Sequence, residues 1–206
     1  MLRFTGSLRN GLKCKLKCNN TRYQNVRYNS EVVVSFKNTS FEYDYGKPII
    51  DEANFSVRKG SKVTIMGQNG AGKSTIVKLI SGALQPNHGS VNSGMGMTVS
   101  MAKQVMAKEC LGISVRDYFL KCLHGNESGL ESRISKVLQQ VNLQAPMDRK
   151  INTFSGGQQA RLLLAAALIT NPDILILDEP TNNLDFEGID DLTQFIQNYD
   201  DTCLVS

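Results

Sequence analysis

The sequence lacks any apolar run long enough to cross a lipid bilayer. The longest run, residues 162–169, is broken up by alanines and is followed by Asn171-Pro172. A transmembrane helix needs about 18 or more consecutive apolar residues. We therefore expect a chain that does not itself span a membrane.

Paired cysteine motifs are also missing, because the chain has five cysteines and none of them stands in a Cys-x-x-Cys spacing. The cysteines are Cys14, Cys18, Cys110, Cys122 and Cys203. An odd, unpaired set argues against a disulfide framework and against a zinc site of the usual ligand spacing. It favours a reducing compartment.

Acidic residues are absent from the first thirty positions, and the first acid is Glu31. The same stretch holds much of the basic charge: Arg3, Arg9, Lys13, Lys15, Lys17, Arg22 and Arg27. Cations mixed with leucines and hydroxyl residues are typical of a mitochondrial presequence, and residues 27–30 resemble a matrix-protease cleavage site. We interpret residues 1–30 as a basic segment that directs the chain to the mitochondrial matrix. The alternatives are a disordered basic tail on a cytoplasmic protein and an RNA-contacting arm.

A folded domain is expected from about residue 31, where short strand patterns and turns begin. Residues 32–36, 53–57 and 62–66 have the apolar and β-branched character of strands. With 206 residues and 41% hydrophobic content, the chain can form one compact core but not two ordinary domains. The predicted domain is 31–206.

A phosphate-binding loop directly follows the predicted strand 62–66. Its residues are Gly67, Gln68, Asn69, Gly70, Ala71, Gly72, Lys73, Ser74 and Thr75. Glycines allow backbone N–H groups to surround an anion, and the helix that begins near Lys73 adds a partial positive charge. The spacing predicts that Lys73 reaches the β- and γ-phosphates, that Ser74 binds Mg²⁺ and that Thr75 donates to phosphate. A glycine turn before a helix is the structural alternative.

Two adjacent carboxylates end a second predicted strand, the continuous apolar run 174–177. Asp178 and Glu179 would then lie at the carboxyl edge of a parallel sheet, where α/β proteins bind ligands. There Asp178 can hold Mg²⁺ through water, and Glu179 can orient the water that attacks a γ-phosphate. The alternative is a pair of acids that ends a strand before Pro180.

A second anion site is predicted at Phe154-Ser155-Gly156-Gly157-Gln158, immediately before an apolar helical run at 159–169. Ser155 is a good helix N-cap, and the two glycines leave backbone N–H groups open to an anion. Since one nucleotide already has its phosphate loop, this second site must serve another nucleotide.

These motifs, in this order, resemble the ATP-binding cassette (ABC) ATPases over about residues 31–206. The resemblance implies an α/β P-loop fold with a mainly parallel core sheet, an N-terminal antiparallel β region and a small helical subdomain. That subdomain would occupy about 105–153, with one helix at 131–141. The resemblance also implies ATP and Mg²⁺ as cofactors. In this family two cassettes dimerise head to tail, so Ser155, Gly156, Gly157 and Gln158 would contact a nucleotide held by a second cassette.

Further site residues are implied by the same resemblance. Tyr43 is similar to the aromatic residue that stacks on adenine, and Tyr45 is the less favoured choice. Gln104, after a predicted strand at 97–101, resembles the glutamine that binds Mg²⁺ and the attacking water, although it could be an ordinary loop residue. Residues 182–185 resemble the loop that crosses the dimer interface.

The sequence of residues 181–185, Thr-Asn-Asn-Leu-Asp, is similar to the corresponding loop of soluble F-class ABC proteins, whose tandem cassettes act on ribosomes. This favours a cassette that hydrolyses ATP in translation. The alternatives are the ATP-binding subunit of a membrane transporter, with permease subunits as partners, and a nucleotide-binding fragment that does not hydrolyse ATP.

The chain also departs from the family pattern. Phe154 replaces the usual leucine, and Ala166 stands where many members have arginine. The family's switch histidine would follow the predicted strand 202–206, and no histidine lies there; His88 and His124 are expected on the surface. We therefore expect a cassette truncated before that histidine, with uncertain ATPase activity and an open sheet edge that lowers its stability.

Overall fold

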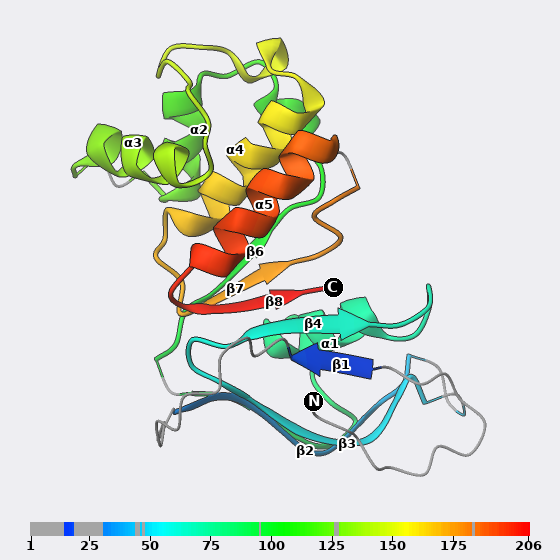
Figure 1. Ribbon diagram of the computed structural model, residues 1–206. Coiled ribbons are helices and arrows are strands. Elements are labelled where there is room, and N and C mark those ends of the chain that lie inside the picture. Colours follow the sequence, from blue (N-terminus) through cyan, green and yellow to red (C-terminus); the bar gives the residue numbers. More distant parts are fainter. Residues whose placement is uncertain are drawn as a thin grey trace.

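The computed structural model describes residues 15–18, 31–43, 46, 48–94, 96–125, 128–182 and 184–206. Two β-sheets and a group of helices are arranged in layers (Figure 1). Every helix in these ranges is too short or too polar to span a bilayer.

The core sheet has the strand order β1-β4-β8-β7-β6. Its strands are β1 (Lys15–Cys18), β4 (Lys62–Met66), β6 (Val99–Ala102), β7 (Ile174–Leu177) and β8 (Thr202–Val205). The last four run parallel, and β1 is antiparallel to β4. All four residues of β7 are buried, which explains its uninterrupted apolar sequence. The strands predicted at 62–66 and 174–177 are confirmed.

A three-stranded antiparallel sheet, in the order β3-β2-β5, forms the second layer. It contains β2 (Val32–Phe41), β3 (Ile50–Arg58) and β5 (His88–Ser93). Phe36 of β2 stacks on Phe55 of β3, with 4.2 Å between the ring centroids. One apolar cluster joins this sheet, helix α1 (Lys73–Ile80) and residues Ile174, Ile176 and Leu204 of the core sheet. Helix α1 is therefore packed into the same core as both sheets.

The other face of the core sheet is covered by helices (Figure 1). They are α2 (Val115–Cys122), α3 (Leu130–Gln140), α4 (Gly156–Leu168) and α5 (Phe186–Asn198), with 3₁₀ turns η1 (Lys108–Cys110) and η2 (Ile151–Thr153). Leu175, Leu177 and Cys203 of the sheet share one apolar cluster with these helices. Helix α3 confirms the amphipathic helix predicted at 131–141, with bounds shifted by one residue.

The fold class is α/β, with a mainly parallel core sheet, an antiparallel β region and helices gathered on one side. This agrees with the sequence-based expectation. One edge differs from it. The sequence predicted that one edge strand of the core sheet would have no hydrogen-bonded neighbour. Residues 15–18 instead form β1, which pairs with the outer edge of β4. Most of the basic segment 1–30 lies outside the described residues.

Candidate nucleotide site

The phosphate loop joins β4 to α1 and requires glycine at two positions. Gly70 and Gly72 have φ angles of 82° and 89°, a region that side chains other than glycine rarely adopt. A Cβ atom at Gly72 would also lie 2.7 Å from Cγ2 of Ile49. The backbone N–H of Ala71 donates to the carbonyl of Gln68 at 3.0 Å and tightens the turn. These features give the loop a tight turn that leads directly into the N-terminus of α1.

Lys73 lies over the beginning of this loop. Its Nζ atom donates to the carbonyl of Gly67 at 3.1 Å and to that of Gln68 at 3.4 Å. Ser74 is exposed at the start of α1, whereas Thr75 is only 5% exposed. The ammonium group and the serine hydroxyl thus lie at the helix end that attracts anions.

Tyr43 lies near the same helix and keeps much of its ring open to solvent. Its hydroxyl is 3.5 Å from Oγ1 of Thr75, and its side chain is 54% exposed. The ring meets Phe41 edge-on, with centroids 4.9 Å apart. An exposed aromatic face beside the loop is suited to stacking on a flat base. Tyr45 lies outside the described residues.

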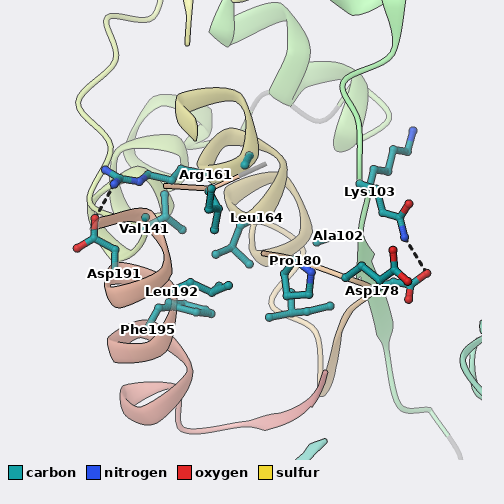
Figure 2. A pocket seen from close by; sticks show the side chains of 16 residues that line it. Ala102, Lys103, Val141, Arg161, Leu164, Asp178, Pro180, Asp191, Leu192 and Phe195 are labelled. Atoms are coloured by element: carbon teal, nitrogen blue, oxygen red, sulfur yellow. Dashed lines mark hydrogen bonds and ion pairs between the residues drawn. The ribbon is translucent and has the colours of Figure 1, made fainter. Parts of the chain in front are cut away.

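The carboxyl ends of β6 and β7 bring Gln104 and Asp178 together (Figure 2). Nε2 of Gln104 donates to Oδ2 of Asp178 at 3.1 Å, and the hydroxyl of Ser206 donates to the other carboxylate oxygen. Because β4 is parallel to β8, and β8 to β7, the phosphate loop leaves the sheet at this same edge. The hydroxyl of Ser74, the amide of Gln104 and the carboxylate of Asp178 are the oxygen ligands that Mg²⁺ prefers.

Glu179 is held in an uncommon backbone conformation, with φ of 48°. Its N–H donates to the carbonyl of Ser206 at 3.0 Å, and Nδ2 of Asn182 donates to its Oε2 at 2.8 Å. A positive φ at a residue other than glycine costs on the order of 1–3 kcal/mol and is often found at functional sites. The first bond holds the backbone of Glu179, and the second directs its carboxylate.

A pocket lies between this edge of the sheet and helices α4 and α5 (Figure 2). In Figure 2, Lys103 and Asp178 lie on one side of the pocket, and the ion pair of Arg161 with Asp191, at 2.6 Å, lies on the other. Gln104 and Glu179 also line the pocket. Apolar side chains complete the lining: Val141, Leu164, Leu177, Leu184, Leu192 and Phe195.

The predicted second anion site is the N-terminus of α4. Ser155 caps the helix: its hydroxyl accepts from the N–H of Gln158 at 3.3 Å, while Oε1 of Gln158 accepts from the N–H of Ser155 at 3.2 Å. A Cβ atom at Gly156 or Gly157 would meet nothing within 4 Å. In Figure 1 the start of α4 is well separated from the loop between β4 and α1. One chain therefore does not bring the two predicted anion sites together.

Two residues of the site were not singled out from the sequence. Ser206 binds the carboxylate of Asp178, and Asn182, noted only as part of a loop, binds Glu179. The signal for Asn182 was its spacing of three residues from Glu179 across the turn at Pro180. The sequence carries no comparable signal for Ser206, because its position depends on β8 lying beside β7.

A protein-family model described as ABC transporter matches residues 50–182. The chain belongs to this family. The matched range contains the phosphate loop, Gln104, the α4 motif and the Asp178-Glu179 pair, so the described geometry is that of an ABC cassette.

The chain is similar to cassettes of more than one kind. It is 31% identical to an energy-coupling factor transporter ATP-binding protein of Bacillus licheniformis, over 86% of this chain and 69% of that protein. It is 34% identical to the ABC transporter F family member 5 of Arabidopsis thaliana, over 84% of this chain and 25% of that protein. The chain spans only 44% and 34% of the lengths of two further relatives, both from clostridia.

Among solved structures, cbiO1 of Clostridium perfringens, described as part of an ABC transporter complex, superimposes with a TM-score of 0.74. The match covers 84% of this chain and 77% of that one, at 21% identity. This similarity shows the shared fold.

Proposed function

We propose that the cassette binds MgATP and hydrolyses it in a head-to-tail dimer. The observation that carries this proposal is the meeting of Gln104, Asp178 and Glu179 at the sheet edge from which the phosphate loop also leaves. Phosphoryl transfer depends on positioning and electrostatic stabilisation, and this edge offers both.

Nucleotide binding needs little rearrangement of the loop. Lys73 exchanges two backbone carbonyls, at 3.1 and 3.4 Å, for the β- and γ-phosphates, which bind a cation more strongly because they are charged. The backbone N–H groups of Gly70 and of residues 72–75 surround the phosphates, whereas that of Ala71 is already bonded to the carbonyl of Gln68. Tyr43 stacks on the adenine, a contact worth on the order of 1–3 kcal/mol in comparable complexes.

Ser74, Gln104 and Asp178 are the residues that would hold Mg²⁺. The bound ion would neutralise charge on the β- and γ-phosphate oxygens. Gln104 is already oriented by its 3.1 Å bond to Asp178, so the two side chains lie side by side where they would hold the ion. Ser206 holds the opposite oxygen of Asp178 and limits its rotation.

Glu179 orients the water that attacks the γ-phosphate. Its carboxylate is directed by Asn182, and its backbone by Ser206. The open N-terminus of α4 in a second cassette, with Ser155, Gly156, Gly157 and Gln158, completes the site by donating to the γ-phosphate. The separation of this motif from the chain's own loop supports such an arrangement (Figure 1).

For the partner, the transporter alternative has more support than the F-class reading. The Bacillus relative is named as a transporter ATP-binding protein. The F-class reading rests on the wording of residues 181–185 and on similarity to the Arabidopsis F family member. Cell fractionation separates them: a transporter cassette should copurify with membranes and a permease subunit, whereas an F-class cassette should follow ribosomes.

The test of the central proposal is MgATP binding and turnover by the full chain beside Lys73→Ala. We expect binding that depends on Lys73 and turnover well above that of the variant. Binding without turnover would instead support a nucleotide-binding fragment that does not hydrolyse ATP.

The basic segment supports a separate proposal, that it directs the chain to the mitochondrial matrix. Its support is the run of cations without an acid before Glu31. Fusion of residues 1–30 to a fluorescent reporter tests it. A reporter that stays in the cytoplasm would favour the cytoplasmic alternative.

A further inference from the structure

A strand from the N-terminal segment covers the outer edge of β4. In β1, Lys15 pairs with Met66 and Cys18 pairs with Val63, in antiparallel register. Within the described residues, β1 is the terminal strand on this side of the core sheet, and Figure 1 shows it beside β4. The strand that leads into the phosphate loop is thus paired on both sides, with β1 and with β8.

β1 also pairs with the part of β4 nearest the phosphate loop. The register of β8 along β4 ends at Thr64, whereas that of β1 continues through Ile65 to Met66. Met66 directly precedes Gly67, the first residue of the loop. Since strand pairing fixes backbone direction, β1 restrains the two residues from which the loop departs.

The sequence of the segment fits an edge strand. Residues 15–18 alternate as Lys-Leu-Lys-Cys, and Leu16 and Cys18 are registered opposite Ile65 and Val63, which are 2% and 8% exposed. The lysines are registered opposite exposed positions of β4. Alternation in step with the partner strand specifies register, and lysine in an edge strand discourages pairing with other chains.

We propose that, in the uncleaved chain, residues 15–18 are a strand of the core sheet that couples the N-terminal segment to the phosphate loop. While β1 is paired, the end of β4 holds the loop in its binding geometry. When β1 is removed by cleavage or unpaired, affinity for MgATP falls and the β4 edge becomes open to a strand from a second copy. Only the affinity change rests on the function proposed above.

The test compares the full chain with two truncations, one lacking residues 1–13 and one lacking residues 1–20. The first keeps β1 and the second removes it. Without nucleotide, we expect the chain lacking residues 1–13 to match the full chain in Tm and in amide exchange. The chain lacking residues 1–20 should lose about 3 °C or more in Tm and show faster amide exchange at residues 63–66. Its MgATP affinity should fall about fivefold.

Two point variants and a synthetic peptide serve as controls for nonspecific effects of truncation. Leu16→Asp should reproduce the loss of Tm and of amide protection, whereas Leu12→Asp, outside β1, should not. A synthetic peptide of residues 13–20 added to the longer truncation should restore protection at residues 63–66. If the longer truncation matches the full chain in Tm and amide exchange, the proposal is overturned. If Tm and amide exchange change but neither the full chain nor any variant binds MgATP, the structural role of β1 is supported and the proposed function fails.

Discussion

At the scale of single residues, the geometry of the loop depends on Gly72 more than on Gly70. Both have positive φ, but only Gly72 faces a neighbour, since a Cβ atom there would lie 2.7 Å from Cγ2 of Ile49. We expect Gly70→Ala to lower the free energy of unfolding by about 1 kcal/mol through backbone strain. Gly72→Ala should cost about 1–3 kcal/mol more and weaken MgATP binding further.

Urea unfolding and nucleotide titration measure both effects. Adding Ile49→Ala to Gly72→Ala removes the colliding methyl group and should recover part of the additional loss, whereas Ile49→Val, which keeps a branched Cβ, should recover little. Equal effects of the two glycine variants would show that the contact with Ile49 is unimportant.

Glu179 and Asn182 provide a second prediction at this scale. Glu179→Gln keeps the size of the side chain but removes the carboxylate, so turnover should fall by about 100-fold or more while MgATP still binds. Asn182→Ala removes the 2.8 Å bond to Oε2 and should lower kcat by a smaller factor, with little change in affinity.

Single-turnover kinetics and equilibrium binding separate the two effects. The double variant is the control for a shared pathway: if Asn182 acts only through Glu179, Asn182→Ala should have no further effect in the Glu179→Gln background. Unchanged turnover in Glu179→Gln would remove this residue from the proposed mechanism.

At the scale of elements, β6 and β7 are joined where they begin. The carboxylate of Asp173 accepts from the N–H of Thr98 at 2.8 Å and from its hydroxyl at 3.0 Å. The same hydroxyl accepts from the N–H of Asp173 at 3.1 Å. The hydrogen bond from the Thr98 backbone, followed by that from its hydroxyl, lowers the pKa of Asp173 below its ordinary value.

This pKa shift gives a signed prediction for stability. Because the folded pKa is depressed, the contribution is fully present above the unfolded value near pH 4 and is lost as pH falls through the folded pKa. Asp173→Asn should therefore destabilise the protein at pH 7, by less than about 1 kcal/mol because the carboxylate is solvent-screened. The difference from wild type should shrink below pH 4.

Urea midpoints measured between pH 7 and pH 3 test this, with Thr98→Ser as the matched control that keeps the hydroxyl. Thr98→Val should behave more like Asp173→Asn. A difference between Asp173→Asn and wild type that is constant with pH would show that the carboxylate charge is not involved.

The elements predicted most directly are those whose signal lies in adjacent residues. The strand 62–66 with its glycine loop and the strand 174–177 with its two acids each combine a buried run and a turn in one short stretch. The contact of Ser206 with Asp178 could not be predicted, because it depends on strand order. β1 was also missed, since four alternating residues in a basic stretch resemble a leader as much as a strand.

At the scale of the whole molecule, the separation of the loop from the start of α4 makes the proposed dimer testable by mixing two inactive chains (Figure 1). Lys73→Ala damages the loop and leaves the α4 motif intact. Gly156→Asp places a negative charge at the α4 N-terminus, where a Cβ atom meets nothing within 4 Å and the fold should tolerate it. Each variant alone has no complete site in a head-to-tail dimer, so each should show almost no turnover.

A mixed dimer is different, because its two sites are not equivalent. One site combines the damaged loop with the damaged α4 motif, and the other combines the intact loop of the Gly156→Asp chain with the intact motif of the Lys73→Ala chain. Random pairing of equal amounts makes about half of the dimers mixed, each with one complete site, so turnover should recover to about a quarter of wild type. Light scattering with MgATP shows whether both variants still dimerise. If they do and mixing restores no turnover, the loop and the α4 motif of one chain serve the same nucleotide, and the head-to-tail arrangement is wrong.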